Sequence, residues 1–222
     1  MEPVIGRIRQ LRERPRLCAL ILGAMCALAF QPLALWPLGL LAMAGLIGLV
    51  SASRGWKEAA LLGWLFGFSH FTLGNNWIAT AFAYQAEMPA WLGWLAVPLL
   101  SIYLALYPAL ATGAARALAG GPVGSGTPMQ QGWALVVLFS GCWTLSEWLR
   151  GWLFTGFAWN PFGIILLGGF DRPGLAALSP WLGTYALSGL AVLLAGVCAM
   201  LLTERAYVAL GVVAGLVAAG ML

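Results

Sequence analysis

The chain has 222 residues, of which 62% are hydrophobic and only 8% are charged. Soluble domains carry about 25% charged residues, so this composition excludes an ordinary soluble domain. The formal charge of +4 is small, and no nucleic-acid partner is expected. The composition predicts an all-α integral membrane protein, with lipid covering much of its surface.

Residues 1–16 hold five of the eleven basic residues, namely Arg7, Arg9, Arg12, Arg14 and Arg16. Arginines before the first apolar run favour a cytoplasmic N-terminus. A cleaved signal peptide is the alternative, because an apolar run containing Ala27-Leu28-Ala29 follows the arginines. The apolar run resumes almost at once, which favours an uncleaved start.

Residues 17–50 carry no charge and are too many for one span of about 20 residues. Gln31-Pro32 and Trp36-Pro37 interrupt this run, so we expect two short helices joined by a tight turn. A polar break holding Arg54 and Lys57 follows.

Further apolar spans are expected at about residues 59–83, 90–115, 132–149, 174–202 and 206–222. Residues 1–222 are therefore expected to form one polytopic bundle of about seven transmembrane helices. With a cytoplasmic N-terminus, the loops at Arg54 and Lys57, at Arg116 and at Arg205 also lie inside. The same count places the C-terminus outside.

The segment from Ser146 to Gly163 brings an acid, an arginine and three tryptophans together. Glu147 and Arg150 are three residues apart and share a helix face. They are expected either to form an ion pair near the lipid headgroups or to hold an anionic headgroup, with Arg150 attracting it. The tryptophans are expected to form an interfacial belt or a wall for acyl chains; they are Trp148, Trp152 and Trp159.

The stretch Thr155–Gly163 is awkward for a helix, because Gly156, Pro161 and Gly163 each weaken or break one. Non-helical backbone at membrane depth needs cover from protein or water. We therefore expect an interfacial or re-entrant loop here.

A second polar group lies near the end of the third span and comprises His70, Asn75, Asn76 and Trp77. The asparagines are costly in lipid without partners, so hydrogen bonds to neighbouring helices are expected. The alternative is that Asn75, Asn76 and Trp77 contact substrate. His70 is expected to be a packing residue rather than a base.

Motifs of known catalytic sites are missing from the sequence. There is no Ser-His-Asp spacing, no paired carboxylates, no phosphate loop and no HExxH, and the four cysteines lack metal-ligand spacing. We expect no metal, no cofactor and no catalytic residue in this chain.

Several motifs, in order along the chain, resemble the membrane region of bacterial apolipoprotein N-acyltransferases. The run Glu147–Trp159 is similar to that family's E-x-L-R-G-W-x-x-T-G-F-P-W, with Ala158 in place of the usual proline. Supporting matches are Phe30-Gln31-Pro32, Trp36-Pro37-Leu38, Gly74-Asn75-Asn76-Trp77-Ile78, Glu87-Met88-Pro89, Tyr103–Leu110, Leu178-Ser179-Pro180 and Gly183-Thr184-Tyr185. Glu87 stands where the family usually has glycine.

The resemblance implies a bacterial inner-membrane protein. Family members move an acyl chain from a phospholipid to the amino group of a lipoprotein's diacylglyceryl-cysteine, using a Glu-Lys-Cys triad in a periplasmic nitrilase-like domain. No residue here matches that triad, and Leu222 stands where that domain begins in the family. We expect the chain to hold phospholipid and lipoprotein acyl chains beneath such a domain, and not to be catalytic alone. The alternatives are a stand-alone lipid- or protein-binding membrane module and a small transporter.

Overall fold

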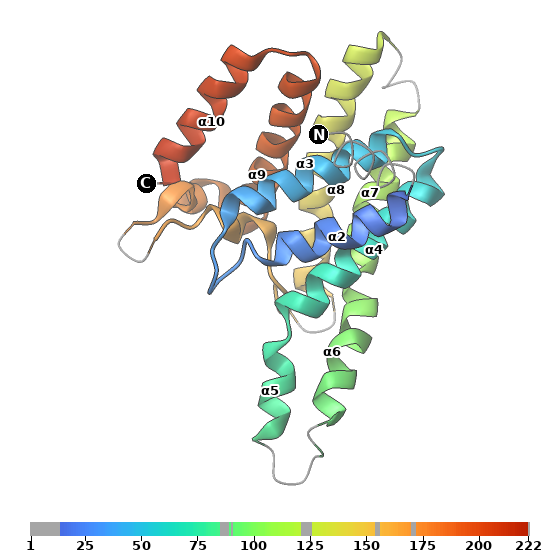
Figure 1. Cartoon of the computed structure of the whole chain (residues 1–222), viewed down its shortest axis with the longest axis vertical. Coiled ribbons are helices and arrows are strands. Elements are labelled where there is room, and N and C mark those ends of the chain that lie inside the picture. The colour runs from blue at the N-terminus through green and yellow to red at the C-terminus, as the bar shows by residue number, and fades with distance from the viewer. Residues whose placement is uncertain are drawn as a thin grey trace, which may run out of the picture.

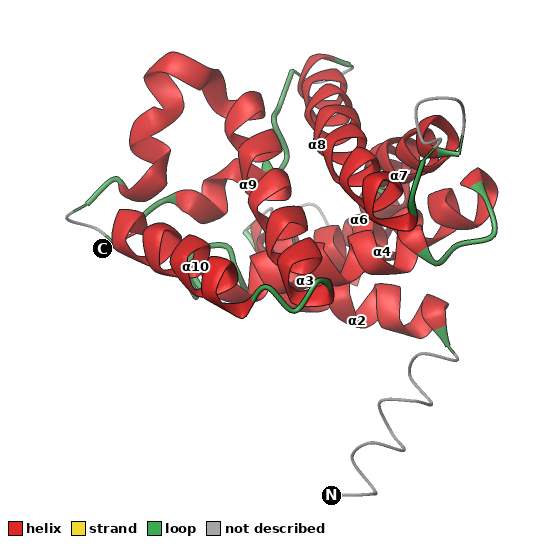
Figure 2. Cartoon of the chain, turned by 90° about the horizontal axis from the view of Figure 1, so that it is seen from above, coloured by secondary structure: helices red, strands yellow, loops and turns green. Residues whose placement is uncertain are grey.

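The structure is a computed structural model that describes residues 14–84, 89, 91–120, 126–153, 156–169 and 172–221. All the regular elements in these ranges are helices (Figures 1 and 2). The prediction of an all-α fold is confirmed.

The first apolar run forms two short helices, as its prolines predicted. Helix α2 spans Pro15–Ala27 and α3 spans Trp36–Ser51. Each begins with proline in its first turn, where the missing amide hydrogen costs no helical hydrogen bond. The connection contains the cis peptide Gln31-Pro32.

Two ranges predicted as single spans are interrupted. Residues 59–83 lie in α4 (Trp56–Gly74) and α5 (Trp77–Ala83), which are separated by two asparagines. Residues 90–115 lie in α6 (Trp91–Leu104) and α7 (Leu106–Ala119).

The break between α6 and α7 has a local cause. Pro108 has no amide hydrogen to donate to Leu104, and its ring crowds that carbonyl, so the helix is interrupted at Ala105. Helices α5 and α6 lie side by side and project from the rest of the molecule (Figure 1).

The second half of the chain contains the two longest helices. Helix α8 (Pro128–Trp152) begins with a capping box between Thr127 and Gln130. The 3₁₀ helices η2 (Phe162–Leu166) and η3 (Gly174–Leu178) lead to α9 (Ser179–Thr203), which is kinked at Gly183, and α10 (Tyr207–Met221) follows.

The core is formed by α4, which packs against α2 and α7, and by α8, which packs against α7 and α9. The Trp143 ring stacks on Phe139 and meets Phe66 and Phe162 edge-on, with centroid distances of 5.9, 6.3 and 6.2 Å. These side chains come from α4, α8 and η2, so aromatic packing joins distant parts of the chain.

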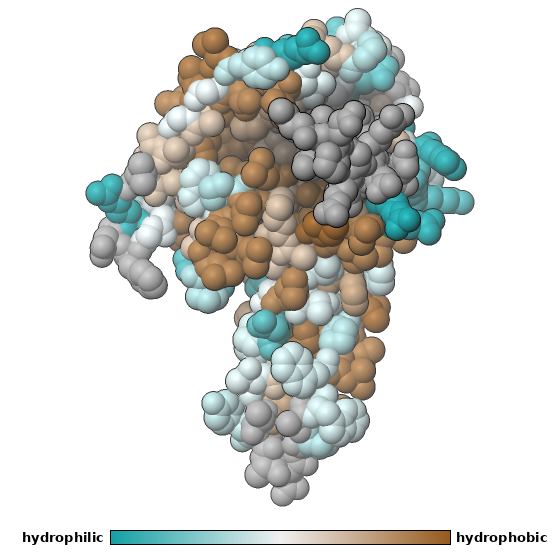
Figure 3. Space-filling model, viewed as in Figure 1, coloured by the Kyte–Doolittle hydropathy of each residue, from teal (hydrophilic) through white to brown (hydrophobic). Residues whose placement is uncertain are grey.

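Apolar side chains also cover much of the outside (Figure 3). Leu41, Val137, Leu145 and Leu216 are each more than 60% exposed. Within the described ranges, two helical stretches are long and apolar enough to cross a membrane, Trp91–Ala119 and Gly174–Thr203. An apolar surface of this kind is typical of contact with lipid or another protein.

Candidate functional site

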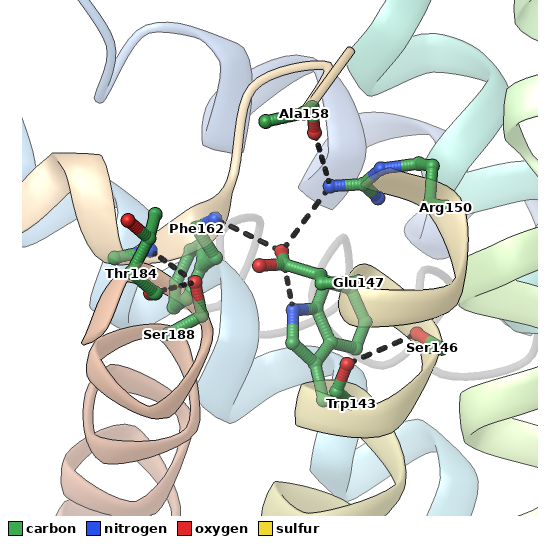
Figure 4. A network of polar contacts seen from close by, with 9 residues as sticks. Trp143, Ser146, Glu147, Arg150, Ala158, Phe162, Thr184 and Ser188 are labelled. Carbon is green, nitrogen blue, oxygen red and sulfur yellow. Dashed lines mark hydrogen bonds and ion pairs between the residues drawn. The ribbon is translucent and has the colours of Figure 1, made fainter. Parts of the chain in front are cut away.

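Glu147 is the centre of a buried polar network near the C-terminal end of α8 (Figure 4). Its Oε1 atom accepts hydrogen bonds from Trp143 Nε1 and from the backbone amide of Phe162, each at 2.9 Å. Arg150 Nη2 lies 3.4 Å from the same oxygen. One carboxylate oxygen thus connects two side chains of α8 with the first residue of η2.

Arg150 is also buried, with only 2% of its surface exposed. Its Nη2 donates to the carbonyl oxygen of Ala158 at 3.4 Å, and its guanidinium lies 5.0 Å from the centroid of the Phe71 ring. The ion pair between Glu147 and Arg150 that the spacing predicted is confirmed. It is buried because α4 covers it through Phe71 and the segment after α8 folds back through Ala158.

Residues 156–161 are not helical, as the glycine and proline pattern predicted, whereas Phe162 and Gly163, at the end of the predicted loop, begin η2; Thr155 lies outside the described residues. Trp159 and Asn160 have φ angles of 48° and 52°, in the left-handed region. Asparagine tolerates this conformation, but a bulky residue such as Trp159 rarely adopts it. Such residues persist only where the surrounding contacts hold them.

Side chains on either side of this segment supply those contacts. Asn160 Nδ2 donates to Asn75 Oδ1, directly after α4, at 3.2 Å. The amide of Gly163 donates to Ser188 Oγ on α9 at 2.8 Å, and the Ser188 hydroxyl donates to the Thr184 carbonyl (Figure 4). The segment is therefore attached to α4, α8 and α9.

Exposed tryptophans lie beside this network. Trp148 and Trp152 stack on each other, with ring centroids 6.0 Å apart, and are 49% and 71% exposed. Trp77 is 56% exposed, whereas Trp159 is half-buried and packs edge-on against Phe157. Contact of these tryptophans, and of Glu147 and Arg150, with lipid stays a prediction.

The two neighbouring asparagines differ. Asn75 is 1% exposed and bonds to Asn160, which lies in the loop rather than on a helix. Asn76 is exposed, and its side chain makes no hydrogen bond that caps α5. The predicted bond to a neighbouring helix is wrong for Asn76, because it faces outward at the start of α5. Contact of either asparagine with substrate stays a prediction.

His70 packs within the aromatic core. Its ring lies 5.1 Å from Phe30 and 4.9 Å from Phe71, and the residue is 5% exposed. Within the described ranges, no group of three His, Cys, Asp or Glu side chains is placed to hold a metal ion. The donors on the Glu147 carboxylate are an indole, a guanidinium and a backbone amide, none of which is a nucleophile.

Three residues of the network were not predicted from the sequence: Trp143, Asn160 and Ser188. Trp143 is four residues before Glu147, so helical periodicity alone places it on the same face. Ser188 and Asn160 meet their partners only through tertiary structure, and no local pattern indicates them.

The sequence is similar to those of known proteins over most of its length. Residues 22–197 match the family model described as the apolipoprotein N-acyltransferase N-terminal domain. A protein named apolipoprotein N-acyltransferase from Ralstonia nicotianae is 39% identical over 181 residues, covering 80% of this chain and 32% of the relative. A relative of the same name from Shewanella oneidensis is 35% identical, and the match covers 84% of this chain and 34% of the relative. Another, from Allorhizobium ampelinum, is 32% identical, and the match covers 100% of this chain and 40% of the relative.

The chain spans about a third of the length of the curated relatives that it matches. The family model covers most of the chain, including α8, the segment after it and most of α9. The chain therefore belongs to the apolipoprotein N-acyltransferase family and corresponds to its N-terminal domain.

Proposed function

We propose that this chain is the membrane domain of an apolipoprotein N-acyltransferase in the bacterial inner membrane. About seven spans cross the bilayer, with the N-terminus in the cytoplasm and the C-terminus in the periplasm. The exposed apolar surface and the two long apolar stretches support membrane insertion. The basic residues Arg54, Arg116 and Arg205 at one end of the helices support the orientation.

The domain holds phospholipid and lipoprotein acyl chains for a nitrilase-like catalytic domain. Acyl transfer itself is assigned to that domain, whether it continues the chain or is supplied separately. The observation that carries the proposal is the attachment of the non-helical segment 156–161 to Arg150 through Ala158, and of the following Phe162 to the buried carboxylate of Glu147, beside the exposed pair of Trp148 and Trp152. Rigid backbone next to exposed aromatic rings suits an amphiphile whose chains lie in the bilayer.

Within this site the candidate residues have different roles. Glu147 and Arg150 are buried, so their role is to position the segment. Trp148, Trp152 and Trp77 are exposed and would contact acyl chains directly.

The test measures phospholipid bound to the purified chain by native mass spectrometry. Replacing both Trp148 and Trp152 by alanine should lower roughly tenfold the retention of the phospholipid held at this end of the helices, because two large aromatic contacts are lost. Trp56→Ala is the control, since Trp56 is 55% exposed but lies at the other end of the helices, as the first residue of α4. Equal retention by the double variant and the control would contradict the proposed site.

A second measurement addresses catalysis. The chain alone should not acylate a diacylglyceryl lipopeptide, and addition of a family nitrilase-like domain should restore transfer. Acylation by the chain alone would contradict the proposed division of labour. Retention of lipid without transfer, even with the catalytic domain present, would favour a stand-alone lipid-binding module.

A further inference from the structure

Two neighbouring cavities lie at the end of the molecule opposite Glu147. They are bounded by the C-terminal ends of α3 and α7 and the N-terminal end of α8, and α9 contributes to the larger one. Their volumes are about 360 Å³ and about 240 Å³. They share the lining residues Ser51, Pro128, Gly132 and Leu135, so they adjoin each other.

The larger cavity is an apolar cleft between three helix faces. From α8 its lining residues are Pro128, Met129, Gly132, Leu135 and Val136, a spacing that follows one helix face. Eight residues of helix correspond to a length of about 12 Å, so the cleft extends well into the apolar part of the molecule.

Gly48 on α3 helps to keep the cleft open. It lines the cavity, and a Cβ atom built there would meet no atom within 4 Å. A larger side chain at this position would therefore occupy open space at the wall of the cleft without displacing its neighbours.

The smaller cavity is polar and is lined by Arg116, Gln131 and Ser51. Arg116 Nε and Nη2 donate to the Ser53 carbonyl at 3.3 and 3.2 Å, which fixes the guanidinium beside the cavity. Guanidinium groups are suited to phosphate, because their donors match its oxygens.

The surrounding end of the molecule is basic. Among the described residues it carries Arg14, Arg16, Arg54, Lys57, Arg116 and Arg205, against Glu58 and Glu204. Hydrophilic residues gather over the α3–α4 and α9–α10 turns (Figure 3). Basic groups at a membrane surface attract anionic lipids.

Glu204 determines which of the two cavities can hold an anionic group. It lines the larger cavity, where its Oε1 accepts a hydrogen bond from Trp133 Nε1 at 2.9 Å. A phosphate would be repelled by this carboxylate and attracted by Arg116, so a headgroup belongs in the smaller cavity and an acyl chain in the cleft.

We propose that this pair of cavities binds one anionic phospholipid, with its phosphate at Arg116 and one acyl chain along Gly48 and Gly132. The site is remote from the Glu147 network, which lies near the other end of α8, and it does not depend on the proposed acyl-transfer role. The lipid bound there would be a structural lipid and not the acyl donor.

Native mass spectrometry of the purified chain with phosphatidylglycerol or phosphatidylcholine tests the site. The Trp148→Ala, Trp152→Ala double variant, which lacks the other proposed lipid contact, should retain one phosphatidylglycerol and prefer it about fivefold, the effect of one basic group near a membrane surface. Gly48→Leu should abolish retention of this lipid, whereas Gly141→Leu, on the exposed side of α8 with equally open space, should not. Arg116→Gln should remove the preference, whereas Lys57→Gln, which removes the same charge outside the cavities, should leave it.

Three results would overturn the proposal. One is retention by Gly48→Leu equal to that of the parent chain, because the cleft would then be dispensable. The second is an equal loss of preference in Lys57→Gln and Arg116→Gln, which would indicate general attraction to a basic surface. Glycerophosphoglycerol, the same headgroup without chains, should not displace the lipid; displacement would show that the cleft contributes nothing.

Discussion

The backbone amide of Phe162 donates to Oε1 of Glu147, fifteen residues earlier in the chain, at 2.9 Å. This bond connects the end of α8 to the start of η2 across a segment whose backbone is not helical. Because the same oxygen faces Trp143 and Arg150, one carboxylate determines where the chain goes after α8. The position of the exposed Trp148 and Trp152 relative to that segment follows from it.

Glu147→Ala should lower the free energy of unfolding by about 3–5 kcal/mol, because it leaves the buried guanidinium of Arg150 unpaired. Glu147→Gln should cost less, since its amide oxygen still accepts from Trp143 and Phe162. Thermal unfolding in detergent, followed by tryptophan fluorescence, measures both. The double variant Glu147→Ala, Arg150→Met should be more stable than Glu147→Ala alone, because it removes the unpaired guanidinium. If the double variant is less stable, the unpaired guanidinium does not cause the destabilisation of Glu147→Ala.

Ser188→Ala should cost about 1–3 kcal/mol, because the buried amide of Gly163 then has no acceptor. Thr72→Ala is the matched control. The Thr72 hydroxyl bonds only to the Phe68 carbonyl within its own helix, so a change within about 0.5 kcal/mol is expected. Chemical denaturation in detergent compares the two, and similar losses would show that Ser188 does not anchor η2.

The sequence predicted those features that have a local cause. Pro32 and Pro37 marked the division between α2 and α3, and Gly156 and Pro161 marked the segment after α8. The spacing of Glu147 and Arg150 predicted their ion pair. The break before α7 also has a local cause, Pro108, but the unbroken apolar run concealed it.

The burial of the Glu147 network could not be predicted from the sequence. It requires α4 to bring Phe71 over Arg150 and α9 to bring Ser188 to Gly163. Charged residues at the edge of an apolar run suggest a surface position, and only tertiary packing reverses that expectation. Asn75 and Asn76 show the same limit, because adjacent identical residues differ only in what the fold places beside them.

These two asparagines provide a matched comparison. Asn75→Ala removes the acceptor of the half-buried Asn160 Nδ2 and should cost about 1 kcal/mol, the net contribution of one hydrogen bond. Asn76→Ala alters an exposed side chain and should change stability by less than about 0.5 kcal/mol. Limited proteolysis of the segment after α8 should accelerate only in Asn75→Ala, and equal acceleration in both variants would contradict the role of the Asn75–Asn160 bond.

The close packing of α8 on α9 gives the last prediction. A Cβ atom at Gly151 would overlap the Tyr185 hydroxyl and lie 2.9 Å from its ring carbon Cζ, so Gly151→Ala must displace the Tyr185 ring or push the two helices apart. Overpacking of this kind costs about 1–3 kcal/mol.

Gly141→Ala, on the same helix with open space at Cβ, should instead stabilise by up to about 1 kcal/mol, because alanine favours helix more than glycine does. Tyr185→Phe removes the overlapping oxygen and should recover part of the loss in Gly151→Ala. The coupling energy comes from the unfolding, in one detergent, of the parent chain, of Gly151→Ala, of Tyr185→Phe and of the variant with both changes. Strictly additive effects would show that Gly151 and Tyr185 do not set the distance between α8 and α9.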